Sequence, residues 1–373
     1  MPADSQTADL SPLFAPFDIG PLNLRNRFVM APMTREFSPN GVPGPDVAAY
    51  YSRRAAAGVG LIITEGTYID HPAAGDSGDV PQLFGDAALD GWRSVVDGVH
   101  AAGGAIIPQL WHRGGRRSPG TGPNPEVPSI SPSGVSYGKI PAARAASLGD
   151  IEEIVASYAR AAGTAQALGF DGIELHGAHG YLIDQFLWER TNQRTDAYGG
   201  DPAGRARFAV EVVMACREAT GPDFPVSFRL SNWKAGDYSA VLAPTAKQLG
   251  ALLHPIAEAG VDVFHVSTRR FFEPAFEGSP LTLAGSVRKL TGISTIAVGS
   301  VGLDGDLWTA YTDGGRAKTT SMDGIIDRFS DDEFDLVGVG RALLSDPQWV
   351  AKLERGAFDE LHSFAAEDRH ILH

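Results

Sequence analysis

The sequence predicts an α/β protein folded as a (β/α)8 TIM barrel, and three features support this prediction. Helical segments alternate strictly with short apolar runs along the chain. The alternation gives eight strands and eight helices, the number that closes such a barrel. A chain of 373 residues is long enough to build all eight units as one domain, residues 1–373. A doubly wound open sheet is the structural alternative.

The segment before the first strand is predicted to close the bottom of the barrel. Residues 10–27 contain apolar pairs around residues 18–20, a pattern that favours a hairpin. Residues 1–10 contain no apolar run that would mark a signal peptide, and we expect them to form a disordered tail. The first strand follows at residues 28–33, FVMAPM.

Most of the later strands follow a helical segment that ends at glycine. The later strands are predicted at residues 60–66, 105–111, 170–177, 225–231, 261–267, 294–299 and 335–340, and all but the last follow such a glycine. Glycine just past a helix end adopts the left-handed conformation that satisfies the last carbonyls and turns the chain. The glycines at these positions are Gly58, Gly103, Gly169, Gly221, Gly260 and Gly292.

Helix and loop signals complete the predicted order of elements. The helix at 151–168 repeats apolar residues at three- and four-residue spacings, and Asp150 with Glu153 suits its N-cap. Residues 312–324 are polar and glycine-rich, which predicts an exposed excursion. The last helix is predicted at 346–355.

Composition excludes several classes of partner and site. The formal net charge of −14 argues against a nucleic-acid or anionic-membrane surface. The single cysteine, Cys216, rules out a disulfide framework, a cysteine zinc site and an iron–sulfur cluster. The sequence contains no run of eighteen apolar residues that would predict a membrane span. We therefore expect a soluble, cytoplasmic protein.

Polar side chains gather on one face of the predicted strands, toward their C-terminal ends. They are Gln109 and Trp111, Glu174 and His176, Ser227 and Arg229, and His265 and Ser267. Residues two apart in a strand share a face, and barrel enzymes place their chemistry at the C-terminal rim. These residues predict a functional site; the alternative is that they satisfy one another inside a wet barrel.

The loops after strands seven and eight indicate a phosphate site. Residues 297–302 and 337–341 are glycine-rich turns that would present backbone N–H groups to an anion. Arg341 adds a fork of donors suited to a phosphate. Tight strand-to-helix turns also need glycine, so the position and Arg341 carry this prediction.

The most concentrated chemistry is HGAHGYL at residues 176–182. His176, His179 and Tyr181 could serve as metal ligands, as proton donors, or as hydrogen-bond donors to a carbonyl. A catalytic zinc needs a third protein ligand, and no nearby residue is an obvious choice. Metal binding is therefore the weaker interpretation, and no metal site is predicted.

Several long motifs resemble the Old Yellow Enzyme family of FMN-dependent ene-reductases, and the resemblance runs nearly end to end. They are NRFVMAPMTR (26–35), IITEGT (62–67), IIPQLWH (106–112), HGAHGYLIDQFLWERTNQRTDAYGGD (176–201), FRLS (228–231), VGS (298–300) and VGVGRALLSDP (337–347). The segment after Gln109 has an extra residue relative to the common pattern, so Arg113, Arg116 and Arg117 receive no role.

The resemblance implies non-covalent FMN and a set of residues that hold it. These residues are Pro32, Met33, Thr34, Gly66, Gln109, His176, Arg229, Gly299, Ser300, Gly340 and Arg341. Arg229 would lie by the edge of the flavin that becomes negative on reduction. Thr34 stands where one branch of the family has a cysteine.

The resemblance also implies a reaction. NADH or NADPH would reduce the flavin, which would then reduce the C=C bond of an α,β-unsaturated carbonyl compound, or a nitro compound, by a ping-pong mechanism. His176 and His179 would bind the acceptor oxygen, and Tyr181 would protonate the α-carbon. Trp111, Phe271 and Phe272 complete the predicted acceptor site, although the two phenylalanines are equally consistent with loop packing. A monomer or a homodimer is expected.

Three other functions remain as alternatives. Larger relatives that begin with a similar barrel carry an iron–sulfur cluster, which one cysteine cannot hold. A flavin-free phosphate-binding aldolase or isomerase is a second, but an aldolase would use a lysine inside the barrel and the predicted strands contain none. A non-catalytic flavin-binding protein is the third, and the presence of His176, His179 and Tyr181 argues against it.

Overall fold

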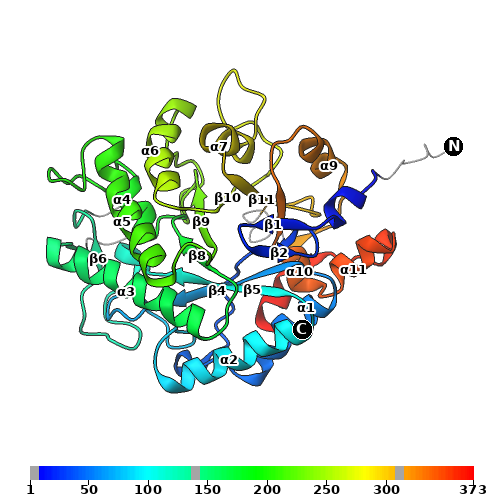
Figure 1. Cartoon of the computed structure of the whole chain (residues 1–373), viewed down its shortest axis with the longest axis horizontal. Helices are drawn as coiled ribbons and strands as arrows, with labels where there is room; N and C mark the ends of the chain where they lie inside the picture. Colours follow the sequence, from blue (N-terminus) through cyan, green and yellow to red (C-terminus); the bar gives the residue numbers. More distant parts are fainter. Residues whose placement is uncertain (1–7, 136–142, 307–314) are drawn as a thin grey trace.

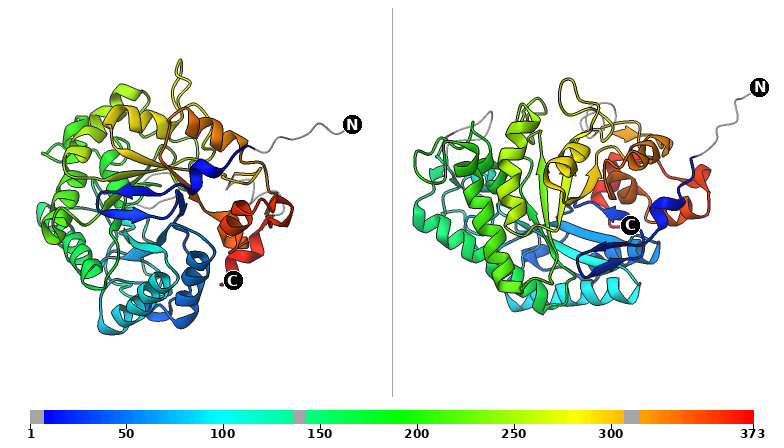
Figure 2. Two further views of the ribbon diagram at one scale, coloured as in Figure 1. Left: turned by 45° about the vertical axis from the view of Figure 1, so that its right-hand side comes forward. Right: turned by 45° about the horizontal axis from the view of Figure 1, so that its top comes forward.

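The chain forms a closed barrel of eight parallel strands surrounded by helices (Figures 1 and 2). The computed structural model describes residues 8–135, 143–306 and 315–373. The barrel strands are β3 (Phe28–Met30), β4 (Leu61–Tyr68), β5 (Ala105–Trp111), β8 (Ile173–His176), β9 (Val226–Ser231), β10 (Val263–Ser267), β11 (Ser294–Val298) and β13 (Leu336–Val339). The ring closes because β13 pairs with β3. The predicted (β/α)8 barrel is confirmed, and the open sheet is excluded.

The helices lie outside the ring (Figure 1), and the longer ones bury an apolar stripe. They are α1 (Pro45–Ala56), α2 (Asp86–Ala101), α3 (Leu148–Ala167), α5 (Pro202–Thr220), α6 (Ala246–Glu258), α7 (Leu283–Thr291), α9 (Asp323–Ser330), α10 (Arg341–Ser345) and α11 (Trp349–Glu354). A short extra helix, α4 (Leu182–Leu187), follows β8. Within the described ranges, no helix is long and apolar enough to cross a membrane.

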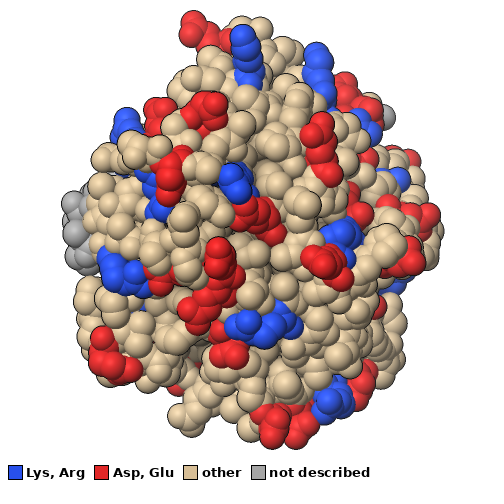
Figure 3. Space-filling view, turned by 60° about the vertical axis from the view of Figure 1, so that its left-hand side comes forward, with Lys and Arg blue, Asp and Glu red and all other residues tan. Residues whose placement is uncertain are grey.

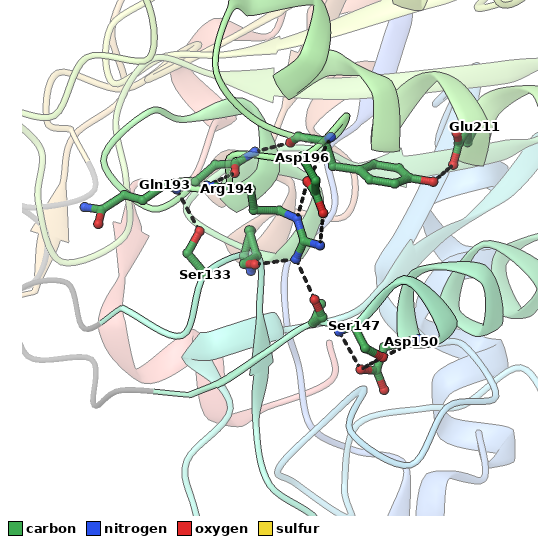
Figure 4. Close-up of polar contacts among 11 residues, drawn as sticks. Ser133, Ser147, Asp150, Gln193, Arg194, Asp196 and Glu211 are labelled. Carbon is green, nitrogen blue, oxygen red and sulfur yellow. Dashed lines mark hydrogen bonds and ion pairs between the residues drawn. The ribbon is translucent and has the colours of Figure 1, made fainter.

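Helix α3 begins at Leu148, so the prediction of Asp150 as its N-cap is wrong. Ser147 is the N-cap, and its hydroxyl accepts a hydrogen bond from the Asp150 backbone N–H at 3.2 Å. The Asp150 carboxylate accepts the Ser147 N–H in return, at 2.8 Å (Figure 4). This reciprocal pair is a capping box in which Asp150 takes the third helical position.

The connection between α4 and α5 is built around Arg194 (Figure 4). Its guanidinium pairs with Asp196 at 2.5 Å and donates to the carbonyl oxygens of Pro132 and Ala146. The guanidinium therefore joins this connection to two points in the long segment between β5 and α3. Arg194, which lies in the motif at residues 176–201, thus has a structural role.

A hairpin closes the N-terminal end of the barrel, as predicted. Strands β1 (Phe17–Ile19) and β2 (Leu22–Leu24) pair antiparallel. Ile19 and Leu24 are buried in one cluster with inward-facing residues near the starts of the barrel strands, Val29 and Leu61 among them. This apolar plug leaves the opposite, C-terminal end for polar side chains.

Two predicted loop segments are more ordered than expected where the structure describes them. Leu10 is buried in the main core, so the predicted disordered tail cannot include it, while residues 1–7 lie outside the described ranges. Residues 312–314 of the predicted excursion also lie outside the described ranges. Strand β12 (Arg316–Ala317) pairs with β14 (Phe364–Ala365), and α9 begins at Asp323. The order around β12 could not be predicted from the local sequence, because it comes from pairing with a segment distant in the chain.

Buried arginines hold the C-terminal residues against the barrel. Arg54 donates to the carbonyl oxygens of Leu343 and His373, both at 3.0 Å. Arg35 donates to the carbonyl oxygens of Arg369 and Ile371. The last residues of the chain therefore lie beside the C-terminal end of the barrel.

The surface shows acidic and basic side chains interspersed rather than a basic patch, on the face drawn in Figure 3. Lysine and arginine side chains on that face therefore lie among aspartate and glutamate side chains.

Candidate active site

A cavity of about 390 Å³ opens at the C-terminal ends of the barrel strands. Every predicted site residue lines it except Phe271 and Phe272. Phe271 is buried in the core and meets Phe272 edge-on, and Phe272 is largely exposed. Their position agrees with the loop-packing alternative and not with acceptor contact.

The cavity wall also includes residues that sequence reasoning did not select. Among them are Trp233, Tyr238 and Arg269 from the loops after β9 and β10, and Phe364 and Arg369 from the C-terminal segment. Trp233 and Tyr238 follow the strand motif FRLS closely, so aromatic residues at a strand end were a usable signal. Phe364 and Arg369 lie far from any predicted strand, and no sequence signal places them here.

A buried carboxylate organises the barrel interior beneath the cavity. Glu174 accepts hydrogen bonds from Gln109 Nε2 at 2.8 Å, Ser227 Oγ at 2.9 Å and His265 Nδ1 at 2.7 Å. Burial raises the pKa of Glu174, but His265, Arg229 and these hydrogen bonds outweigh it and lower the pKa overall. Because the carboxylate only accepts, the Gln109 amide nitrogen faces it, and the Gln109 carbonyl oxygen remains for a ligand.

Arg229 is a buried cation whose guanidinium has no hydrogen-bond partner among the described residues. Its side chain lines the cavity, its Nε is buried without a partner, and no ion pair includes it. Burial lowers its pKa, and Glu174 partly opposes that effect. A buried guanidinium left in this state is costly, so the site is suited to an electron-rich group that would accept from it.

His176 and His179 lie side by side, with ring centroids 5.2 Å apart. Burial, and secondarily the positive charge of Arg229, lowers the pKa of both rings well below the usual value. His176 Nδ1 is buried without a partner, while His179 Nε2 lies 2.8 Å from Ser267 Oγ. Both rings are therefore neutral at neutral pH and suited to donate an N–H rather than to act as acids.

Tyr181 completes this wall and packs edge-on against Trp111 and His176, with centroids 4.9 and 4.8 Å away. Trp111 reaches this place because residue 66 is glycine: a Cβ there would come within 2.5 Å of the indole. The phenol lines the cavity next to both histidines. A phenol beside two neutral imidazoles is the group best placed to give a proton.

The opposite end of the cavity is lined by the loops after β11 and β13. Gly299, Ser300, Gly340 and Arg341 lie together there, as predicted. The Arg341 guanidinium donates to the Gly305 carbonyl oxygen at 2.6 Å, which fixes its position. Arg369 lines the same cavity, so a second cation is present. Among the lining residues that the structure describes there is no aspartate or glutamate, in a chain of net charge −14.

The two histidines have no third ligand for a metal. Across the described part of the chain, no group of three or more His, Cys, Asp or Glu side chains lies close enough together to hold a metal ion. The geometry around His176 and His179 supports hydrogen bonding to a ligand oxygen instead.

Comparisons with known proteins relate the chain to flavin oxidoreductases. Residues 12–360 match the model of the NADH:flavin oxidoreductase / NADH oxidase family. The chain is 44% identical to rice 12-oxophytodienoate reductase 7 over 243 residues, which cover 62% of this chain and 61% of that protein. It is 36% identical to an NADH oxidase of Thermoanaerobacter brockii over 94% of this chain and 52% of that protein. The aligned part thus spans less than two thirds of either relative.

Solved structures with the same architecture match over nearly the whole chain. Morphinone reductase in complex with tetrahydroNAD is 29% identical, with a TM-score of 0.77 and 97% of each chain covered. An Old Yellow Enzyme homologue from Zymomonas mobilis is 25% identical, with a TM-score of 0.79 and 96% of each chain covered.

Proposed function

Because the chain belongs to the NADH:flavin oxidoreductase / NADH oxidase family, we propose that it is an FMN-dependent ene-reductase. In this proposal NADH or NADPH is the reductant, and the acceptor is an activated C=C bond of an α,β-unsaturated carbonyl compound. Reductant and acceptor use the same cavity in turn, which makes the cycle ping-pong. Nitro compounds, whose oxygens the same donors can bind, are a second class of acceptor.

The observation that carries the proposal is the unpartnered Arg229 guanidinium beside two neutral histidines. A flavin fits this arrangement, because Arg229 can donate to its electron-rich pyrimidine edge and the Gln109 carbonyl oxygen can accept its N–H. Backbone of Pro32, Met33 and Gly66 would lie along the ring system. When bound, FMN supplies two-electron chemistry, taking hydride from the nicotinamide and giving hydride to the acceptor.

The phosphate of the cofactor would be held at the other end of the cavity. The backbone N–H groups of the loops after β11 and β13 and the guanidinium of Arg341 provide the donors. Arg369 adds a further positive charge from the C-terminal segment. The described lining residues include no carboxylate, which favours an anionic ligand.

His176 and His179 bind and polarise the acceptor. Each neutral ring donates an N–H to the carbonyl oxygen, which draws electron density from the conjugated double bond and makes its β-carbon electrophilic. Trp111 and Trp233 line the walls and limit the water that can reach this point. Tyr181 then gives its phenolic proton to the α-carbon, which completes the reduction.

The test is to purify the protein, release its cofactor by heat and identify it by mass spectrometry. We expect FMN, and we expect NAD(P)H oxidation to depend on added 2-cyclohexenone, with the saturated ketone as product. The same assay with each nicotinamide gives the preferred reductant. FAD, no flavin after reconstitution, or no enone turnover would reject the proposal.

A further inference from the structure

A lysine and an aspartate form an ion pair directly behind the acceptor site. Lys234 Nζ lies 2.6 Å from Asp184 Oδ1, and the two side chains are 1% and 0% exposed. In the described part of the chain, no other ion pair of a lysine or arginine has both side chains this deeply buried. Because moving two charges out of water is costly, such a pair often stabilises a core less than apolar side chains of similar volume would. Neither residue lines the cavity, and neither has a role in the reaction proposed above.

The second oxygen of Asp184 holds the turn that carries His179 and Tyr181. Asp184 Oδ2 accepts the backbone N–H of Gly180 at 2.5 Å. His179 and Gly180 both have left-handed backbone conformations, with φ of 63° and 80°. A histidine rarely adopts this conformation, so the turn requires support from its surroundings. Asp184 supplies that support from the first turn of α4.

Lys234 ties the same turn to the loop after β9. The Ala235 N–H donates to the His179 carbonyl oxygen at 3.1 Å, and residues 179 and 234 form a parallel bridge. Trp233, next to Lys234 in sequence, stacks on the His179 ring with centroids 4.3 Å apart. The ion pair therefore connects two loops that hold the His179 backbone and one face of its ring.

We propose that Asp184 and Lys234 are positioning residues that set the places of His179 and Tyr181 relative to the acceptor. The inference rests on the function proposed above. Removal of the anchor on Gly180 would let the turn relax, moving His179 and the Tyr181 phenol together. Small displacements of groups that must meet a reacting atom have large effects on rate.

Two double variants separate positioning from simple stabilisation. Asp184→Leu with Lys234→Met fills the buried space with apolar side chains but leaves the Gly180 N–H without its acceptor. Asp184→Asn with Lys234→Met also removes both charges, but the asparagine carbonyl oxygen can still accept that N–H. As a matched control, Asp346→Leu with Lys352→Met removes another buried lysine–aspartate pair, whose members do not line the cavity.

In stopped-flow measurements on the FMN-loaded protein, we expect the Leu/Met variant to slow enone reduction by about 10- to 100-fold. Its solvent deuterium isotope effect on that step should rise, because proton delivery by Tyr181 becomes limiting. Flavin reduction by the nicotinamide should change far less. The Asn/Met variant keeps an acceptor for the Gly180 N–H but loses the ion pair, so it should be slowed less than the Leu/Met variant. The control pair should stay close to the wild type in both steps.

Amide hydrogen exchange provides a readout that needs no turnover. The Gly180 N–H should exchange faster in the Leu/Met variant and remain protected in the Asn/Met variant. Equal slowing of both half-reactions in the two Asp184 variants, or unchanged exchange at Gly180 in the Leu/Met variant, would overturn the inference. Failure of the wild type to reduce any enone would instead reject the proposed function, and exchange at Gly180 would still decide whether Asp184 anchors the turn.

Discussion

Single residues in the cavity owe their properties to burial rather than to their type alone. A histidine in water is protonated half the time near pH 6.5, but His176 and His179 are held neutral because burial and Arg229 lower their pKa values. Each ring is therefore a hydrogen-bond donor across the physiological range. In the proposed function, the two histidines therefore act as donors and the Tyr181 phenol as the acid.

Replacement of a histidine tests the donor role. His176→Ala or His179→Ala should lower kcat/KM for a simple enone by about 10²- to 10³-fold, since each removes one oxyanion-type donor. FMN content, measured by absorbance, should be retained. His179→Asn keeps a side-chain N–H and should recover most of the activity. Unchanged enone reduction in the double alanine variant would show that the histidines do not bind the acceptor.

Tyr181→Phe tests the proton donor. We expect enone reduction to slow by roughly 10²- to 10⁴-fold, the range for a positioned general acid, while flavin reduction by the nicotinamide is nearly unchanged. Nitro-group reduction, which needs no proton on carbon, should suffer less. With nicotinamide deuterated at the transferred position, the label should appear only at the β-carbon, trans to a solvent hydrogen at the α-carbon. Syn addition would remove Tyr181 from this role.

At the scale of elements, a histidine pair joins the loops that follow β4 and β5. His112 Nε2 lies 3.0 Å from His71 Nδ1, and the rings are buried. His71 Nδ1 also accepts the Ala73 N–H, and His112 Nδ1 accepts the Gly114 N–H. Protonation of these accepting nitrogens would break the bonds that shape both loops. Burial accordingly lowers the pKa of each ring.

This pair predicts a loss of stability in acid. Between the lowered folded-state pKa and the unfolded value near 6.5, the unfolded chain binds more protons, so stability is fully present above about pH 6.5 and falls below it. Each such histidine contributes a slope of up to about 1.4 kcal/mol per pH unit. The free energy of unfolding, measured with urea between pH 5 and 8, should depend less steeply on pH for His112→Asn than for the wild type. His254→Asn, at an exposed position, controls for the substitution itself; equal slopes for the two variants would refute the assignment.

At the scale of the whole molecule, the C-terminal segment is part of the cavity. Phe364 and Arg369 line it, β14 pairs with β12, and Arg35 and Arg54 hold the final residues.

Truncation after Ser363 should weaken FMN binding by about 10- to 100-fold, the value of one charge-assisted contact. Fluorescence titration of the reconstituted protein measures this, with Arg369→Met as the milder variant. Equal affinity in truncated and full-length protein would exclude the segment from the FMN site.

The barrel and the polar residues at its C-terminal rim could be predicted because local patterns determine them, whereas Pro32, Met33, Thr34 and Gly66 were expected only from the family resemblance. Strand–helix alternation, glycines at helix ends and polar residues at strand ends are all properties of short segments, and the closed barrel confirms them. The N-cap of α3 was predicted wrongly because two nearby residues suit the same position. Ser147 and Asp150 both suit the N-cap of α3, and the reciprocal hydrogen bonds decide between them.

The sequence by itself determined the fold class, the order of the strands and the cluster of His176, His179 and Tyr181 at one rim, because each depends on periodicity or on spacing within one element. Only the tertiary structure placed Arg369 and Phe364 at the cavity, joined Lys234 to Asp184, and left the Arg229 guanidinium without a hydrogen-bond partner among the described residues. These contacts connect residues far apart in the chain. They depend on how the closed ring aligns its loops and on which polar groups burial leaves unsatisfied, neither of which is encoded in any single segment.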